Sequence, residues 1–152
     1  MAQPGPARST PLDEQLCFAL YAASRAMTSC YRPMLDALDL TYPQYLVLLV
    51  LWEQGDSTVT GIGGALQLET GTLSPLLKRL EAAGLITRNR QAGDERSVLV
   101  ALTDAGRELE AHVAEAQVNV GAATGLSRAE IVDLRETLRL LSDRLRAAAS
   151  SR

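Results

Sequence analysis

Apolar side chains recur every three to four residues along most of the 152-residue chain, as they do in amphipathic helices. A first helix is expected between Thr10 and Pro33. Its apolar face is formed by Leu12, Leu16, Leu20, Ala23 and Met27. A second helix is expected from Thr41, which has the spacing of a capping box with Gln44. The run Tyr45–Trp52 is apolar on every side, which places this helix in the core.

Two shorter helices are expected to follow. The first runs from Thr58 to about Leu68. The second begins near Thr70–Thr72, and the position close to Thr72 is favoured because Pro75 is comfortable only in the first turn of a helix. Leucines spaced three and four residues apart give the second helix one apolar side, with its polar residues elsewhere. Gly84 is expected to end it, since glycine readily adopts the left-handed conformation that follows many helices.

Two short extended runs come next, at residues 85–90 and 97–102. The connector between them, residues 91–96, is rich in turn-forming and charged residues. This pattern predicts a β-hairpin with a basic tip.

The remainder of the chain is expected to be helical. A long helix should begin at Thr103, and the last helix should begin at Ser127, where Glu130 completes a second capping box. Four leucines then follow at a 4-3-4 spacing, which is the seam of a helix that packs against a partner helix. They are Leu134, Leu138, Leu141 and Leu145.

These elements describe a mostly α protein with a small β-hairpin wing, in the order of a winged helix-turn-helix. The winged domain is complete without the leucine seam, so we expect a homodimer formed by the N- and C-terminal helices. The expected divisions are a disordered tail (1–10), N-terminal sensing and dimerisation helices (11–40), a winged helix-turn-helix DNA-binding domain (41–102), C-terminal dimerisation helices (103–148) and a short tail (149–152).

The net charge of −3 conceals one basic segment: residues 70–96 carry five basic and three acidic side chains. A local excess of this kind is what contact with phosphates requires. In a winged helix-turn-helix the second helix enters the major groove and the hairpin reaches the backbone or the minor groove. The pattern leaves open a helical bundle with an ordinary exposed helix. The candidate DNA-binding residues are Thr70, Gly71, Thr72, Ser74, Pro75, Lys78, Arg79, Arg88, Arg90, Asp94 and Arg96.

Other features narrow the class of protein. The two cysteines form no CxxC motif, and the single histidine has no partner at metal-ligand spacing, so we expect no disulfide scaffold, metal or other cofactor. The longest apolar run is too short to span a membrane, and the first ten residues lack the apolar segment of a signal peptide. A cytoplasmic protein without a membrane partner is expected.

Several short motifs occur in a specific order: ETGTLSPLLKRLE at 69–81, GLI at 84–86, DERS at 94–97 and LTDAG at 102–106. In their order and spacing they resemble the MarR family of dimeric repressors. Near the N-terminus, LCFALY at 16–21, Tyr31 and TYPQY at 41–45 resemble the OhrR subfamily, whose members sense organic hydroperoxides. The resemblance extends over nearly the whole chain, from about residue 12 to residue 145.

The resemblance implies a role for particular residues. Cys17 is similar to the peroxide-sensing cysteine, and Tyr31 and Tyr42 to the phenols that hydrogen-bond it across the dimer. Tyr21 matches a further tyrosine of the sensor. In the wing, the Asp94 carboxylate would orient Arg96 for the minor groove.

The chemistry of Cys17 is compatible with that role, because a thiolate attacks peroxide to give a sulfenic acid and phenol donors favour the thiolate. The pattern alone favours an inert core cysteine over a sensor at this position, and the resemblance reverses that preference. Cys30 would lie about 20 Å away along the same helix, too far for a disulfide within the chain. The oxidised cysteine is therefore expected to be captured by a low-molecular-weight thiol or oxidised further, with an intersubunit role for Cys30 as an alternative.

Together these features predict a DNA-binding repressor, not an enzyme. The reduced homodimer would occupy a double-stranded, pseudopalindromic operator, and an organic hydroperoxide would act as inducer by oxidising Cys17. One alternative is a MarR-type repressor that responds to a small aromatic ligand, with Cys17 incidental. A less favoured alternative is a thiol peroxidase, which would have no use for a wing and a recognition helix.

Overall fold

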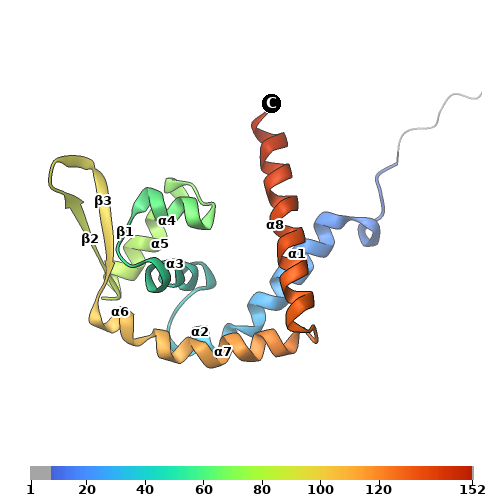
Figure 1. The fold of residues 1–152 in the computed structure, drawn as a ribbon, viewed down its shortest axis with the longest axis horizontal. Helices are drawn as coiled ribbons and strands as arrows, with labels where there is room; N and C mark the ends of the chain where they lie inside the picture. Colours follow the sequence, from blue (N-terminus) through green and yellow to red (C-terminus); the bar gives the residue numbers. More distant parts are fainter. Residues whose placement is uncertain (1–7, 152) are drawn as a thin grey trace, which may run out of the picture. The chain divides into compact units, whose positions relative to one another are not determined.

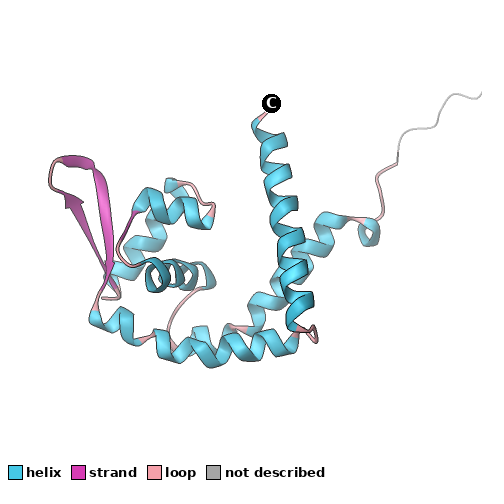
Figure 2. Cartoon of the chain, in the orientation of Figure 1, coloured by secondary structure: helices cyan, strands magenta, loops and turns pink. Residues whose placement is uncertain are grey.

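The structure is a computed structural model that describes residues 8–151, apart from the side chain of Glu95. The expected N-terminal tail therefore lies largely outside the described residues. The chain divides into two compact units, residues 1–116 and 117–152. Helices dominate and the few strands form one small sheet (Figure 1, Figure 2). No helix in the described part of the chain has the length and apolar character to cross a membrane.

The N-terminal segment forms a 3-10 turn, η1 (Leu12–Glu14), then the helices α1 (Leu16–Cys30) and α2 (Arg32–Ala37). The expected start at Thr10 is wrong. The first full helix begins at Leu16 with Gln15 before it, and the Gln15 side-chain amide donates to the carbonyl of Thr10 at 3.0 Å. The expected break near Pro33 is confirmed, because the helix ends just before Tyr31 and the proline lies in the first turn of α2.

Helix α3 (Tyr42–Gln54) forms the centre of the core. Its predicted capping box is confirmed: the Thr41 amide donates to Gln44 Oε1 at 2.9 Å, and the Gln44 amide donates to Thr41 Oγ1 at 3.4 Å. The predicted burial of the helix is also confirmed. Its fully or nearly fully buried apolar side chains are Tyr45, Val47, Leu48, Val50 and Leu51.

Helices α4 (Val59–Leu66) and α5 (Thr70–Ala82) complete the helix-turn-helix. A Cβ at Gly63 would lie 2.8 Å from the carbonyl oxygen of Leu68, so only glycine permits this close turn between the two helices. The start of α5 at Thr70 lies within the expected range Thr70–Thr72, but the preference for Thr72 is wrong. Pro75 lies beyond the first turn, where it cannot donate to the carbonyl of Gly71.

The expected hairpin consists of β2 (Ile86–Gln91) and β3 (Asp94–Leu102), and a two-residue strand, β1 (Ser57–Thr58), joins β3 to give the order β1-β3-β2. All pairs are antiparallel. The turn is shorter than the expected connector 91–96, because β3 already begins at Asp94 and Gly93 makes the reversal with a φ of +93°. Figure 2 shows the hairpin extending away from the helices that precede it.

The C-terminal helices are α6 (Asp104–Glu108), α7 (Glu110–Ala123) and α8 (Arg128–Ser150). The single long helix expected from Thr103 is thus interrupted at Leu109. The capping box at the start of α8 is confirmed: the Ser127 amide donates to Glu130 Oε2 at 2.7 Å, and the Glu130 amide donates to Ser127 Oγ at 3.2 Å.

Candidate nucleic-acid interface and cysteine sensor

Helix α5 separates an apolar side from a polar side. Leu73, Leu77 and Leu80 are buried in the core. The predicted DNA-contacting residues of this helix are all exposed on the surface of the protomer. They are Thr70, Gly71, Thr72, Ser74, Pro75, Lys78 and Arg79. The helix therefore presents short hydroxyls near its start and two cations further along, which suits entry into a groove of DNA.

The wing carries two exposed cations, Arg90 and Arg96. The Asp94 carboxylate accepts a hydrogen bond from the backbone amide of Arg96 at 3.0 Å. It therefore holds the backbone from which Arg96 projects, and its observed contact is not with the guanidinium. Across the hairpin, the Ser97 hydroxyl donates to Gln91 Oε1 at 3.0 Å, which ties the two strands together near the tip.

Arg88 differs from the other cations because it is paired within the protein. Its guanidinium donates to Glu81 Oε1 at 3.0 Å, and its backbone amide donates to Glu81 Oε2 at 3.1 Å. The hydrogen bond from the Arg88 side chain holds the pKa of Glu81 below its usual value, and desolvation opposes it. Glu81 could not be singled out from the sequence, because no local pattern links residues seven positions apart on a helix and a strand.

Cys17 lies near the start of α1 and is exposed. Its thiol donates a weak hydrogen bond to Gln15 Oε1, with Sγ and oxygen 3.7 Å apart. Tyr21 lies one turn further along and is also exposed, and the guanidinium of Arg25 lies 5.4 Å from the centre of its ring. Within this protomer, then, Cys17 and Tyr21 share a surface of α1.

Tyr31 and Tyr42 come together in a cluster with a third tyrosine, Tyr45. The ring centres lie 5.6 Å apart for Tyr31 and Tyr42, 5.5 Å for Tyr31 and Tyr45, and 5.8 Å for Tyr42 and Tyr45. Tyr45 was expected in the core, and it is 1% exposed. Two of the three phenols predicted to tune Cys17 therefore share one site, and Tyr21 lies elsewhere.

The environment of these phenols keeps them protonated. Burial raises the pKa of Tyr31 to about 12, and its tyrosine neighbours, a hydrogen bond to Tyr45 and the Cys30 thiol act in the same direction. Burial also raises the pKa of Tyr42, with Tyr45 as the second cause. Both groups are therefore neutral O–H donors at any physiological pH, which is the form that can stabilise a thiolate.

The cysteine and the phenol cluster lie at opposite ends of one helix. Cys17 is the second residue of α1 and Tyr31 follows its last residue, so the two are separated by about 21 Å along the helix axis. A phenol of the cluster cannot reach Cys17 of the same protomer. Cys17 and Cys30 are likewise both on α1, as expected, which rules out a disulfide between them within one chain.

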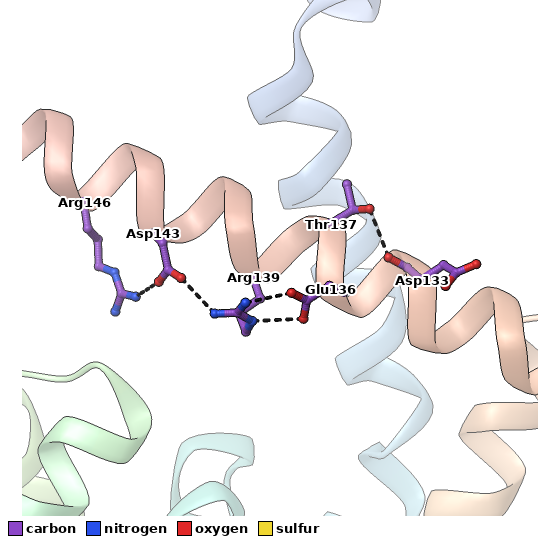
Figure 3. A network of polar contacts seen from close by, with 6 residues as sticks. All are labelled: Asp133, Glu136, Thr137, Arg139, Asp143 and Arg146. Carbon is purple, nitrogen blue, oxygen red and sulfur yellow. Dashed lines mark hydrogen bonds and ion pairs between the residues drawn. The ribbon is translucent and has the colours of Figure 1, made fainter.

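Helix α8 carries the predicted leucine seam on one face. Leu134, Leu138 and Leu145 are 47%, 39% and 58% exposed. Leu141 is half-buried. The opposite face holds a chain of charges, in which Arg139 bridges Glu136 and Asp143, and Asp143 also pairs with Arg146 (Figure 3). At about 100° per residue, these two sets lie on opposite sides of the helix. One face is thus suited to water, and the other still exposes apolar side chains.

The helix-turn-helix followed by a β-wing, with exposed hydroxyls and cations on α5 and the wing, defines a winged helix-turn-helix protein of the DNA-binding class. The comparisons with known proteins agree. Residues 29–113 match the family described as "Transcriptional regulator SarA/Rot".

Two relatives and one solved structure are similar over most of the chain. The organic hydroperoxide resistance transcriptional regulator of Bacillus subtilis (strain 168) is 52% identical over 126 residues, which cover 82% of this chain and 83% of that protein. The HTH-type transcriptional regulator TtmR of Methylorubrum extorquens (strain PA1) is 48% identical over 151 residues, covering 99% and 77%. The structure of reduced AbfR bound to DNA has a TM-score of 0.74 and 39% identity, covering 88% of this chain and 94% of that one.

The chain belongs to the MarR-type family of winged helix-turn-helix transcriptional regulators, in the group that resembles organic hydroperoxide regulators. The predicted family and fold class are therefore confirmed. The family consists of DNA-binding regulators, which also confirms the prediction of a regulator rather than an enzyme and removes the thiol peroxidase alternative.

Proposed function

We propose that this regulator is a homodimeric repressor that binds operator DNA while Cys17 is reduced and releases it when an organic hydroperoxide oxidises Cys17. The observation that carries the proposal is the separation of Cys17 from the phenols of Tyr31 and Tyr42. Cys17 is exposed at one end of α1, and the protonated phenols lie about 21 Å away at the other end. Only a second protomer can bring the two together.

The exposed apolar face of α1 supports this arrangement. Leu16 and Met27, which lie on one side of α1, are 61% and 48% exposed, and no residue of α1 is buried. Apolar faces of this length are normally covered by a partner. An antiparallel contact between two copies of α1 would bring Cys17 of each copy to the phenol cluster of the other.

The reaction follows from thiolate chemistry. The Cys17 sulfur attacks one peroxide oxygen, the O–O bond breaks, and the leaving alkoxide takes up a proton to become an alcohol. The sulfur is oxidised by two electrons to a sulfenic acid and the peroxide is reduced. A low-molecular-weight thiol then condenses with the sulfenic acid, which gives a mixed disulfide and water. The oxidised sulfur can no longer accept the phenol hydrogen bonds as a thiolate does, so oxidation favours a second arrangement of the dimer.

The proposal is tested by gel shift with wild-type protein and a duplex selected by that protein from random sequence. Stoichiometric organic hydroperoxide should release the DNA, and a thiol reductant should restore binding. Release by a small aromatic carboxylate with no effect of peroxide would favour the alternative of a ligand-responsive repressor. Because the protein would act on chromosomal operators, we expect it to work in the cytoplasm.

Removal of either cluster phenol should slow the sensor. Tyr31→Phe and Tyr42→Phe each delete one donor to the thiolate, which should lower the thiolate fraction of Cys17 at neutral pH and slow its reaction. The measurement is the rate of Cys17 alkylation across a pH series, with Cys30→Ser as the common background. Operator affinity of the reduced variants should stay at the wild-type value as the control for folding. Unchanged rates in both variants would contradict the sensor assignment of the phenols.

The exposed cations should contribute individually to operator binding. Lys78→Ala, Arg79→Ala and Arg96→Ala should each weaken binding, and loss of one phosphate contact should lower the salt slope of the association constant by about one unit. Loss of a residue that hydrogen-bonds a base edge would instead weaken binding by roughly 1–3 kcal/mol and relax the sequence preference at one operator position. Arg107→Ala, which removes a cation on α6 that already pairs with Asp104, is the matched control. Equal slopes for all four variants would exclude phosphate contacts by this face.

A further inference from the structure

Strand β2 carries two arginines, Arg88 and Arg90, separated by one residue. Alternate residues of a strand project from the same face, so the two guanidinium groups start from the same side of the wing. The two side chains differ in their surroundings: Arg90 is exposed, whereas Arg88 is half-buried and paired with Glu81. A hollow between α5 and the wing is lined by Glu81, Arg88, Arg90 and Val98.

Glu81 lies in the last turn of α5, the helix that would enter the DNA groove. Each of its carboxylate oxygens accepts one hydrogen bond from Arg88: one from the guanidinium at 3.0 Å and one from the backbone amide at 3.1 Å. The backbone bond matters most for geometry, because it fixes the position of the strand and not only that of a side chain. Two charge-assisted hydrogen bonds also fix the relative orientation of the two residues better than a single ionic contact does.

The pair is also partly shielded from solvent. The Arg88 side chain is 30% exposed and that of Glu81 is 40% exposed. The Nε atom of Arg88 is buried and has no hydrogen-bond partner among the described residues. A guanidinium held in this way is turned toward the protein, so reaching a phosphate would break its bond to Glu81 and leave a half-buried carboxylate without its cation.

We propose that Glu81 assigns different roles to the two arginines: it holds Arg88 as a positioning residue that fixes the wing relative to α5, and it leaves Arg90 as the cation that contacts operator phosphate. This inference rests on the proposed binding of DNA by α5 and the wing, and is independent of the redox chemistry. The Glu81–Arg88 pair fixes the distance between α5 and the wing, which must contact the same DNA together. Its loss should therefore affect specific binding, in which both elements dock, more than non-specific binding.

The two possible roles of Glu81, positioning the wing and repelling DNA, predict opposite changes in operator affinity when its charge is removed. Glu81 is a negative charge beside a DNA-binding surface, so electrostatics alone predicts tighter binding to any DNA when the charge is removed. Positioning predicts weaker binding to the operator. Glu81→Gln keeps the size of the side chain and removes the charge. Glu69→Gln is the matched control, because Glu69 is exposed at the other end of α5 and its side chain makes no capping hydrogen bond.

The experiment compares a duplex selected by the wild-type protein with a random duplex of equal length, by fluorescence anisotropy over a range of salt. Glu81→Gln should bind the selected duplex about tenfold more weakly and the random duplex as tightly as wild type or more so. Glu69→Gln should bind both as tightly as wild type or more so. Operator binding by Glu81→Gln at or above the wild-type affinity overturns the inference. A wild-type protein that selects no duplex overturns the proposed function itself, which is a different outcome.

A double-mutant cycle with Arg88→Ala supplies the second readout. Arg88→Ala should weaken operator binding in the wild-type background, have little further effect beside Glu81→Gln, and leave the salt slope unchanged. Arg90→Ala should lower the slope by about one unit in both backgrounds. Thermal unfolding of each variant, with a transition as cooperative as that of wild type, verifies that the domain is folded. A slope lowered by one unit in Arg88→Ala would show that Arg88 contacts phosphate, and would overturn its role as a positioning residue.

Discussion

Cys17→Ser should bind operator DNA with the wild-type affinity and should remain bound after stoichiometric organic hydroperoxide. The substitution keeps the size of the side chain and its ability to accept a phenol hydrogen bond, but a serine hydroxyl does not react with peroxide. In the wild-type protein, oxidation should weaken operator binding by about 5–150-fold, the usual range for coupling between two sites. In Cys17→Ser the affinities with and without peroxide should be equal, as measured by gel shift or anisotropy.

The second cysteine supplies the matched control for this result. Cys30 is also exposed and also lies on α1, so any thiol-specific artefact should affect it similarly. Cys30→Ser should respond to peroxide as the wild type does. If Cys17→Ser still leaves the operator on treatment, or if Cys30→Ser alone abolishes the response, Cys17 is not the sensor.

Features with a local physical cause were predictable from the sequence. The capping boxes at Thr41 and Ser127 form as expected, because each is decided by residues three positions apart. The exposed polar side of α5 followed from the leucine spacing alone. By contrast, the preference for a start close to Thr72 was wrong, because Pro75 lies inside α5 and not in its first turn.

Features that depend on distant residues were not predictable. A two-residue strand such as β1 has no periodicity of its own and exists only because β3 lies beside it. The Glu81–Arg88 pair connects a helix to a strand, and the pattern of charges in residues 70–96 could not separate Arg88 from Arg90. The resemblance pointed to Tyr31 and Tyr42, but the contact of Tyr45 with both of their rings depends on three rings meeting in the folded core.

In the proposed function, DNA binding and sensing both depend on the dimer, and the leucine seam of α8, which we propose to form part of it, offers a direct way to break it. The leucine seam remains substantially exposed in the protomer, and the ion-pair network of Arg139 occupies the opposite face of the helix. Leu138→Asp would place a charge in the middle of the seam, where burial against a partner would cost several kcal/mol in each of two symmetry-related copies. We therefore expect a monomer by light scattering at concentrations at which the wild type is a dimer.

Leu140→Asp is the matched control, because Leu140 is 42% exposed on the same helix but lies roughly 100° or more around the axis from Leu138 and Leu141. It introduces the same charge and should remain a dimer with wild-type operator affinity. Leu138→Asp should lose operator binding at low protein concentration, because one winged domain presents few cations and a symmetric operator requires two half-sites roughly 34–36 Å apart. Its Cys17 should also be alkylated more slowly, since the phenols that favour the thiolate would come from the missing partner. A monomeric Leu138→Asp with wild-type operator affinity would refute the half-site interpretation, and one that alkylates at the wild-type rate would refute the contact of Cys17 with phenols across the dimer.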